Sequence, residues 1–289
     1  MVITRPLLCA RAKTVADLRF PVWATPKLDG IRALKLGSMV SRAFKPIRNR
    51  YIQRMLSSLP DGLDGELMVA GTFQDIGSGV NSFGGTPDFR YCIFDYVTDL
   101  AAPYYRRLEQ LNALSLPSCC EVLPVTELTS LAAFLAYEAQ CIAEGYEGVI
   151  TRSALGPYKC GRSTLSEHYA VKFKRYEDSE ALILGFTEQH TNQNEQVPNA
   201  FGLMKRPGGA GNKLPKGTLG SFEVQDIHTG IRFEVGTGDG LTTALRQQIW
   251  DNKAAYLGAI IRYRYQATGV KDRPRFPSFL GFRSAEDMS

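Results

Sequence analysis

Apolar and polar positions alternate in two ways along the first 175 residues. Short apolar runs typical of strands occur at residues 63–69, 91–97 and 148–151, and segments with helical spacing occur at residues 50–59, 104–114 and 128–143. The last segment is the clearest helix, because apolar side chains recur every three or four positions at Leu128, Leu131, Ala132, Leu135 and Ala139. Residues 75–88, rich in Gly and Ser, predict a loop. Strands mixed with helices predict an α+β fold.

The pattern changes after residue 174. Short β-like runs follow at residues 181–186, 220–224, 231–235 and 260–265. One helix is predicted at residues 241–256, where Leu241, Leu245 and Ile249 form an apolar stripe. A five-stranded barrel with one helix is the oligonucleotide/oligosaccharide-binding (OB) arrangement. We therefore predict two domains, residues 1–177 and residues 178–289.

Composition is that of an ordinary globular protein, with 44% apolar and 22% charged residues. No uncharged apolar run approaches the roughly 18 residues of a membrane span, and charged residues interrupt the first 20 positions where a secretory signal would lie. The six cysteines form no C-x-x-C pair and no cluster with zinc spacing. We expect a cytoplasmic protein with reduced thiols and no membrane partner.

The net charge of +5 is modest, but its distribution is uneven. Residues 27–54 contain eight basic residues and only one acid, Asp29, and residues 262–275 contain five basic residues and only Asp272. These stretches predict either one phosphate-binding surface or two ordinary solvated faces.

The segment from Lys27 to Arg32 reads K-L-D-G-I-R. It fits a strand end followed by an Asp-Gly turn, and it also fits a nucleophilic lysine beside a phosphate. A lysine amine must lose its proton before it attacks phosphorus, and nearby cations such as Arg32, Lys172 and Lys174, or a bound divalent metal, favour that loss.

Five further segments decide between these interpretations because they occur in a fixed order. They are residues 41–49 (SRAFKPIRN), 64–67 (DGEL), 94–96 (FDY), 144–150 (EGYEGVI) and 171–174 (VKFK). With the Lys27 segment, this series resembles the compact ATP-dependent DNA ligases of the covalent nucleotidyltransferase superfamily, of the type found in viruses and some bacteria. The resemblance runs over nearly the whole chain. The four-cysteine zinc module and extra domain of NAD-dependent ligases do not appear in it.

The resemblance implies an adenylation domain of antiparallel sheets with flanking helices, followed by an OB-fold barrel. It implies that Lys27 takes AMP from ATP, that AMP passes to a DNA 5′-phosphate, and that a 3′-hydroxyl then seals the nick. ATP and Mg²⁺ (or Mn²⁺) are the implied cofactors, and nicked double-stranded DNA is the implied partner of a monomer. If the chain is viral, the compartment is the host cytoplasm.

The resemblance also assigns site residues. Around the nucleotide it places Thr25, Pro26, Leu28, Arg32, Arg42, Arg48, Glu66, Phe94, Lys172 and Lys174. Which of Arg42 and Arg48 is the arginine of its segment stays open, and so does the plain interpretation of Phe94 as a core residue. Glu147 is the implied metal ligand, with Glu66 as a second ligand and Glu144 as the weaker alternative to Glu147.

The residue pattern supports one of these assignments independently. On a strand, Lys172 and Lys174 point to the same side, while Val171 and Phe173 point to the core. Two ammonium groups on one face repel each other, so an anion such as an α-phosphate is favoured between them. A solvated strand face is the alternative.

A further set is expected to bind DNA or to act in domain closure. It contains Lys45, Arg50, Lys205, Arg206, Lys213, Lys216, Arg275 and Arg283. The Gly/Pro-rich residues 205–216 predict a loop, either a disordered hairpin tip or an arm that orders on DNA. Residues 273–283 resemble the last family motif, although the Arg-x-Asp-Lys form of many members is missing, so the arginine that orients pyrophosphate stays open. Pro274 and Pro277 restrict this segment, which fits a preset loop or a plain chain end.

Two other families use a similar lysine. An RNA ligase shares the first two steps, and an mRNA-capping guanylyltransferase uses GTP. A non-catalytic DNA-binding barrel protein is the alternative from a different class, and in such a protein Lys27 would be dispensable.

Overall fold

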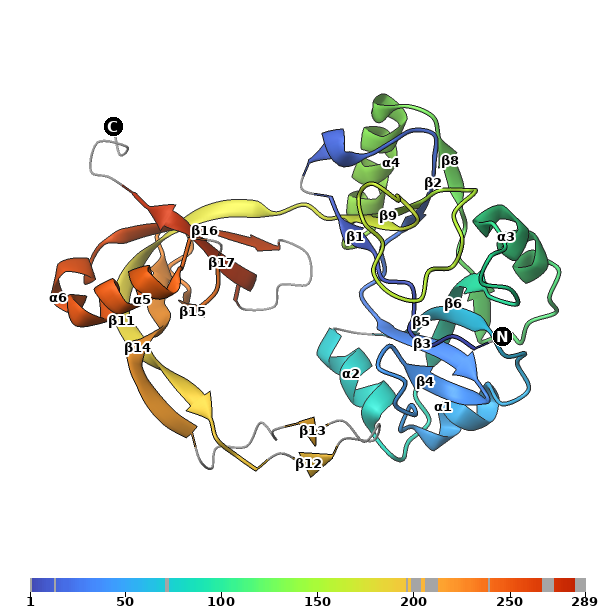
Figure 1. The fold of residues 1–289 in the computed structure, drawn as a ribbon, viewed down its shortest axis with the longest axis horizontal. Helices are drawn as coiled ribbons and strands as arrows, with labels where there is room; N and C mark the ends of the chain where they lie inside the picture. Colours follow the sequence, from blue (N-terminus) through green and yellow to red (C-terminus); the bar gives the residue numbers. More distant parts are fainter. Residues whose placement is uncertain are drawn as a thin grey trace. The chain divides into compact units, whose positions relative to one another are not determined.

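The computed structural model describes residues 2–12, 14–70, 73–195, 197–198, 204–205, 213–238, 240–266 and 273–283. Contacts divide the chain into two compact units, residues 1–174 and residues 175–289 (Figure 1). The boundary predicted from the sequence, between residues 177 and 178, lies slightly further along the chain. No helix in the described segments is long and apolar enough to cross a membrane.

One five-stranded sheet of the first unit has the order β4-β3-β5-β6-β7. Its strands are β3 (Ile31–Leu36), β4 (Ser38–Ser41), β5 (Leu63–Val69), β6 (Phe89–Tyr96) and β7 (Cys120–Val122). Only the β6–β7 pair is parallel. Helices α1 (Arg50–Met55) and α2 (Phe73–Asn81) pack on one face of this sheet, and α3 (Tyr104–Asn112) follows β6 in the chain (Figure 1).

Side-chain alternation gives this sheet two different faces. Leu63 and Leu67 of β5 point into the core under α1 and α2, so Asp64 and Glu66 point to the opposite face. Glu66 lies directly across from Arg32 in the register of β3 and β5. The sheet therefore presents charged side chains on the face away from α1 and α2.

A second sheet of the first unit has the order β1-β10-β9-β2-β8. Its strands are β1 (Ala10–Arg11), β2 (Val22–Pro26), β8 (Thr126–Leu128), β9 (Val149–Arg152) and β10 (Val171–Phe173), and the short 3₁₀ turn η1 (Val15–Asp17) precedes β2. Helix α4 (Leu131–Ala143) lies alongside it (Figure 1). Ala24, Val149 and Val171 pack under α4, so Thr25, Ile150 and Lys172, which pair across the strands, point the other way.

Helix α4 confirms the predicted helix, but the apolar residues whose spacing predicted it are not the ones that it buries. Leu131 and Leu135 are 42% and 39% exposed, whereas Phe134, Glu138 and Cys141 are buried. The physical reason is aromatic packing, because the Phe134 ring contacts Phe20 at 6.4 Å and Phe173 at 5.3 Å between centroids.

The prediction of a loop at residues 75–88 is wrong for the first half of this segment, which belongs to α2. Ile76 and Val80, four positions apart, pack into the core with Leu67. Gly77 and Gly79 lower the helix propensity of the segment. Tertiary packing of the apolar face overrides that propensity.

The second unit is an antiparallel sheet with the order β15-β14-β11-β16-β17. Its strands are β11 (Glu177–Asn192), β14 (Lys213–Asp226), β15 (Arg232–Val235), β16 (Ile260–Gln266) and β17 (Arg275–Phe282), and its helices are α5 (Thr243–Asp251) and α6 (Lys253–Tyr256). The Phe279 amide donates to the Thr237 carbonyl at 2.6 Å, which links the end of β17 to the segment after β15. This is the predicted barrel with its helix, and Leu241 and Ile249 are buried as expected.

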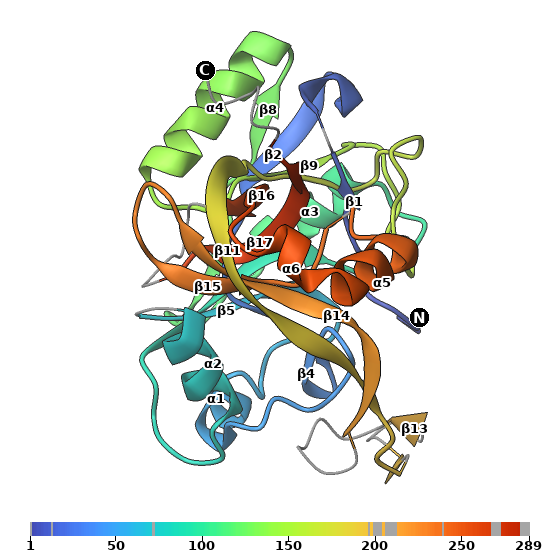
Figure 2. The ribbon, with the colours of Figure 1, turned by 90° about the vertical axis from the view of Figure 1, so that its left-hand side faces the viewer.

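The two longest strands, β11 and β14, run side by side as one extended hairpin (Figure 2). Residues 213–216, predicted as loop, continue β14 and pair with residues 190–192 of β11. The short strands β12 (Val197–Pro198) and β13 (Met204–Lys205) pair with each other near the end of this hairpin. Arg206 and the residues up to 212 lie outside the described part of the chain. Residues 275–282, expected as a preset loop or a plain chain end, form β17 because Phe279 and Phe282 pack into the barrel core.

Asp226 ends β14 and accepts several hydrogen bonds within the second unit. Its Oδ2 accepts from Ser179 Oγ at 2.7 Å and from the Tyr263 hydroxyl at 2.6 Å, and its Oδ1 accepts from the Thr229 amide at 2.7 Å. Burial alone would raise the pKa of Asp226, but these hydrogen bonds outweigh it and lower the pKa to about 2.

We predict that Asp226→Asn destabilises the second unit by about 2 kcal/mol near pH 7, from the difference between its folded and unfolded pKa. Because the folded pKa lies below the unfolded one, this stabilisation is present above about pH 4 and is lost as the pH falls towards 2. Urea unfolding followed by Trp250 fluorescence in a Trp23→Phe background measures it. A difference between the two proteins that stays constant from pH 7 to pH 2 would contradict the assignment.

Candidate active site

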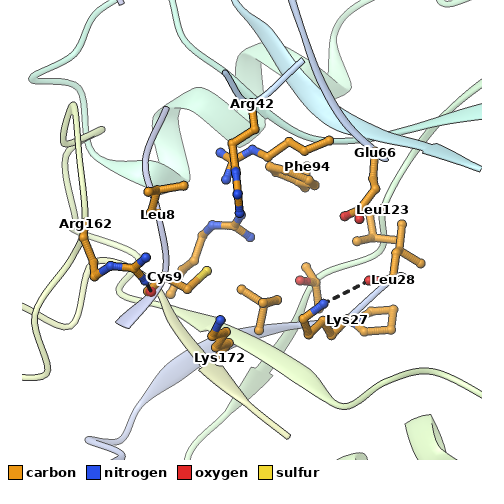
Figure 3. A pocket seen from close by; sticks show the side chains of 15 residues that line it. Leu8, Cys9, Lys27, Leu28, Arg42, Glu66, Phe94, Leu123, Arg162 and Lys172 are labelled. Atoms are coloured by element: carbon orange, nitrogen blue, oxygen red, sulfur yellow. Dashed lines mark hydrogen bonds between the residues drawn. The ribbon is translucent and has the colours of Figure 1, made fainter. Parts of the chain in front are cut away.

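A cavity of about 200 Å³ lies in the first unit, and residues from both sheets line it (Figure 3). Thr25, Pro26 and Lys172 come from the sheet that contains β2, and Lys27 and Leu28 follow β2 directly. Arg32, Glu66 and Phe94 come from the sheet that contains β5, and Arg42 follows β4. In Figure 3, Lys27 and Lys172 lie on one side, and Arg42 points into the cavity from the other. Lys27 and eight of the ten residues expected around a nucleotide therefore meet in one cavity.

The position of Lys27 is set by backbone pairing. Its amide donates to the Gly148 carbonyl at 2.8 Å, and the Glu147 amide donates to the Lys27 carbonyl at 3.0 Å. These bonds extend the pairing of β2 with β9 by one step beyond Pro26. Two residues 120 positions apart in the chain are thereby held next to each other.

The Glu147 carboxylate lies between two lysines. Oε2 accepts from the Lys27 amine, and Oε1 pairs with the Lys174 amine at 2.6 Å. The carboxylate is 3% exposed, and the two lysine side chains are 18% and 15% exposed. Burial alone would raise the pKa of Glu147, but the charges of Lys27 and Lys174 outweigh it and hold the pKa below its ordinary value. Glu147 is thus ionised and in contact with the lysine of the first motif.

Gly148 allows this arrangement to form. Its φ is +145°, and a Cβ added there would lie 2.3 Å from the Phe173 carbonyl oxygen. Only glycine permits β9 and the end of β10 to approach so closely. That approach brings Lys174 to the carboxylate of Glu147.

Burial makes the charged forms of Lys172, in β10, and Lys174, just after it, less favourable. Burial lowers the pKa of Lys172, and the nearby charge of Lys27 lowers it further. Burial also lowers the pKa of Lys174, despite its contact with Glu147. A bound anion would relieve both effects.

Glu66 occupies the side of the cavity where Leu123 lies (Figure 3). Its Oε1 accepts from the Gly30 amide at 3.0 Å. Burial raises the pKa of Glu66 above its ordinary value. Glu66 and Glu147 are thus two carboxylates close to Lys27, but no cluster of three or more His, Cys, Asp or Glu side chains occurs among the described residues.

Arg32 is held rigidly. Its Nε and Nη2 donate to both oxygens of Asp64 at 2.9 and 2.5 Å, and its Nη1 donates to the Leu7 carbonyl at 2.7 Å. Asp64 is fully buried and also accepts from the Tyr158 hydroxyl at 2.6 Å. Burial alone would lower the pKa of Arg32, but Asp64 outweighs it and raises the pKa. Because the fork is bidentate, the guanidinium plane is fixed at the cavity wall.

Phe94 is 7% exposed and packs with Leu28 and Leu123. It lines the cavity with two guanidinium groups over its ring, those of Arg32 at 5.3 Å and of Arg152 at 4.8 Å from the centroid. The ring is therefore both a core residue and part of the cavity wall.

Arg152 lines the cavity and was not identified from the sequence. It ends β9, is 6% exposed, and also lies over the Tyr104 ring at 5.1 Å. Its buried Nε has no hydrogen-bond partner within the described segments. Strand alternation could have identified it, because residue 152 lies on the same face of β9 as Ile150, away from the core.

Cys9 and Arg162 were also missed. Arg162 Nη1 donates to the Cys9 carbonyl at 2.7 Å, and both side chains lie on one side of the cavity (Figure 3). They belong to irregular segments outside the named motifs, where spacing carries no signal.

Several expected site residues lie outside the cavity. Arg48 and Arg50 place their guanidinium groups over the Phe83 ring at 5.5 and 4.9 Å. Lys45 is exposed. Glu144 ends α4 and accepts from Gln140 Nε2 at 2.8 Å.

The remaining expected residues belong to the second unit. Lys213 and Lys216 are exposed on β14, and the backbone of Lys205 belongs to β13. Arg275 begins β17, with its guanidinium 5.1 Å from the Phe276 ring centroid. Arg283 forms an ion pair with Glu180.

Comparison with known proteins identifies the family. A family model of the DNA ligase OB-like domain matches residues 210–283. The crystal structure of Chlorella virus DNA ligase-adenylate is 34% identical, covers 98% of this chain and 100% of its own, and has a TM-score of 0.57. The chain belongs to the family of compact ATP-dependent DNA ligases.

A second crystal structure of the Chlorella virus DNA ligase-adenylate shares 36% identity over 99% of this chain and 100% of its own, with a TM-score of 0.56. A Lig E DNA ligase shares the fold, with a TM-score of 0.73 at 23% identity over 98% of this ligase and 100% of that chain. No curated protein sequence matches this ligase.

We predict that Gly148→Ala destabilises the first unit by about 3 to 4 kcal/mol, because the new Cβ overlaps the Phe173 carbonyl and the residue must keep an unfavourable φ. The matched control is Gly145→Ala, since Gly145 has a φ of +86° but open space around its Cβ position. It should cost only about 1 to 2 kcal/mol. Urea unfolding followed by Trp23 fluorescence in a Trp250→Phe background compares the two. Equal losses would show that close strand approach at Gly148 is unimportant.

Proposed function

We propose that this ligase joins a 3′-hydroxyl to a 5′-phosphate at nicks in duplex DNA, with ATP as the nucleotide donor. The observation that carries the proposal is the amine of Lys27, held against Glu147 at the edge of a cavity lined with cations. We also propose that the ligase acts as a monomer, because the lysine, the carboxylate and the cations that the chemistry needs all lie within its first unit.

The proposed reaction has three balanced steps. Lys27 Nζ forms a bond to the α-phosphorus of ATP as the bond to the bridging oxygen breaks, so pyrophosphate leaves and the amine releases its proton. A DNA 5′-phosphate oxygen then attacks this phosphorus, the nitrogen–phosphorus bond breaks as Lys27 Nζ takes up a proton, and AMP is joined to the DNA end. Finally the 3′-hydroxyl oxygen attacks the 5′-phosphorus and releases AMP and a proton.

Each step needs positive charge around non-bridging phosphate oxygens. Arg32 provides a fixed guanidinium, because Asp64 holds its other edge. Lys172 provides an ammonium whose burial makes a phosphate partner favourable. Phe94 and Leu28 provide an apolar wall for the base.

We propose that Mg²⁺ assists, because Glu147 and Glu66 fit an ion that binds few carboxylates and retains waters and phosphate oxygens. Glu147 would hold the ion, with Glu66 as the second carboxylate. When bound, the ion would neutralise charge on the phosphates. Because both oxygens of Glu147 are paired with lysines, it would have to exchange at least one of these contacts.

Replacing Lys27 tests the proposed nucleophile. With Mg²⁺ and α-labelled ATP, the wild type should retain label on the denatured protein and release it when nicked DNA is sealed. Lys27→Ala and Lys27→Arg should retain none, and Lys27→Arg keeps the positive charge as a control. Affinity for nicked DNA should change by less than about threefold, because one charge among many phosphate contacts is altered.

Label taken from GTP alone would favour an mRNA-capping activity instead. Sealing of nicked RNA in preference to nicked DNA would favour an RNA ligase. Wild type without label from either nucleotide, after treatment with pyrophosphate to remove bound AMP, would contradict the proposal.

We predict that Arg152→Gln slows attachment of AMP to Lys27 by about 10²-fold, the usual loss when one buried donor to a reacting phosphate is removed. The reason is that Arg152 lines the cavity and that its buried Nε has no hydrogen-bond partner among the described residues. Arg90→Gln is the control, since Arg90 is exposed and already paired with Glu121. Single-turnover rates at several ATP concentrations separate binding from chemistry. An unchanged rate in a folded Arg152→Gln protein would remove Arg152 from the site.

A further inference from the structure

Two adjacent cysteines lie where β7 begins. Cys119 belongs to the turn before the strand, and Cys120 is the first residue of β7. No other two of the six cysteines are neighbours in the sequence. Both thiols are free and half-buried. Neither residue lines the nucleotide cavity, and the proposed reaction does not use them.

The two cysteine side chains contact the same core. Successive residues of a strand point to opposite faces, but Cys119 lies in the turn that the Cys120 amide closes by donating to the Pro117 carbonyl at 2.8 Å. Both side chains pack against the core under α1 and α2. Burial, and then the charge and hydrogen bonding of the Cys119 thiol, raise the pKa of Cys120 to about 12. The two sulfurs therefore lie within reach of each other.

The peptide group between the two cysteines is held at both of its polar ends. Its carbonyl, on Cys119, accepts from the Tyr91 amide at 2.8 Å, which joins it to β6. Its N–H, on Cys120, is the donor to the Pro117 carbonyl. A rotation of this peptide plane would therefore break at least one hydrogen bond, and the bond to Tyr91 belongs to the edge where β6 and β7 meet.

A short path leads from this peptide group to the nucleotide cavity. β7 pairs with β6 in parallel, with Cys120 beside Tyr91. Just after β7, the Leu123 amide donates to the Ile93 carbonyl at 2.8 Å. Leu123 lines the cavity and packs against Phe94, the residue after Ile93 (Figure 3). The strand pairing that begins at the two cysteines thus positions one wall of the cavity.

A disulfide between neighbouring residues cannot form without moving the peptide group that they share. Consecutive Cα atoms are about 3.8 Å apart across a trans peptide, whereas most disulfides join Cα atoms about 4.4 to 6.8 Å apart. The small ring that results is strained, and strained disulfides are easily reduced again, which is typical of regulatory ones. Because both thiols are only half-buried, a small disulfide can reach them from the solvent.

We propose that Cys119 and Cys120 form a reversible disulfide when a small disulfide of the glutathione class oxidises them, and that the oxidised pair weakens nucleotide binding in the cavity. One cysteine sulfur attacks the small disulfide and releases one thiol. The other cysteine sulfur then attacks this mixed disulfide and releases the second thiol. The pair loses two electrons and two protons, and the small disulfide gains them. The effect on the nucleotide rests on the proposed ligase function.

The first test counts free thiols. All proteins carry Cys9→Ala, because Cys9 lies inside the cavity and could respond by itself. After equilibration in glutathione buffers, the protein is denatured and alkylated with a maleimide, and its intact mass gives the number of free thiols. This parent protein should lose two thiols on oxidation without gaining glutathione, and further substitution of the half-buried Cys160 by Cys160→Ser should not prevent this loss.

Substitution of either member of the pair should prevent ring closure. Cys119→Ser and Cys120→Ser, each in the parent background, should keep their thiols or carry bound glutathione, because no second sulfur is available to close the ring. The loss of two thiols in either variant would overturn the proposal. A parent that keeps all its thiols in oxidised glutathione, or that stops at a mixed disulfide, would overturn it as well.

The second test measures attachment of AMP in single turnovers at several ATP concentrations. The oxidised parent should need about 5-fold more ATP, or a still higher excess, for its half-maximal rate, which is the lower end of the usual coupling between two sites. Dithiothreitol should restore the reduced value. The Cys119→Ser/Cys120→Ser variant should show the same ATP dependence in both buffers. An oxidised parent with unchanged ATP dependence would overturn the coupling to the cavity.

Hydrogen exchange tests the path and separates this inference from the proposed function. Oxidation should speed exchange of the Tyr91 amide about 5-fold, the change expected when one hydrogen bond is lost, because its acceptor on Cys119 moves. Unchanged exchange at Tyr91 in the oxidised parent would overturn the path. A reduced parent that attaches no AMP contradicts the ligase proposal, whereas the thiol count and the exchange rates still decide whether the disulfide forms and moves β7.

Discussion

The candidate active site depends on one backbone contact, the pair of hydrogen bonds that joins Lys27 to Glu147 and Gly148. This contact continues the antiparallel register of β2 and β9. The strand pairing therefore determines that Glu147 lies beside Lys27. A slip of one residue would turn the side chains of one strand to the other face. Gly148 then lets the end of β10 approach, which brings Lys174 to the same carboxylate. Three motifs far apart in sequence thus converge through ordinary sheet geometry.

The period of the strands also explains why the cavity is charged. In both sheets of the first unit, one face is covered by helices and packed with apolar side chains. The alternate positions must point away from that core, and they are the positions of Arg32, Glu66 and Lys172. Burying such groups is unfavourable unless they find partners. Asp64 supplies one for Arg32, whereas no ion pair joins Lys172 or Arg152 to an acid within the part of the chain that the structure describes.

Much of this was accessible from the sequence, and the exceptions have physical causes. The strand at residues 63–69 follows from local pattern, and the motif residues of the cavity follow from the resemblance to the ligase family. The buried face of α4 does not follow from the sequence pattern. Phe134 is buried there because it packs against Phe20 and Phe173, whereas the regularly spaced leucines stay exposed. Helix α2 is stabilised by packing and not by its glycine-containing sequence. Arg48 belongs to a recognised motif, yet a turn in the chain directs it to Phe83 and away from the cavity. Spacing along a sequence cannot report the direction that a loop takes.

Unpaired cations indicate anion-binding surfaces better than the net charge of +5 does. Exposed arginines such as Arg90 and Arg106 are paired with glutamates, and such pairs contribute little to stability or to ligand attraction. Arg152 in the cavity and Arg48 and Arg50 beside Phe83 instead have no ion pair with an acid among the residues that the structure describes. Burial in the cavity makes the missing partner of Arg152 costly. An unpartnered buried cation lowers the stability of the unbound protein slightly, and a phosphate bound in the cavity would reverse that loss.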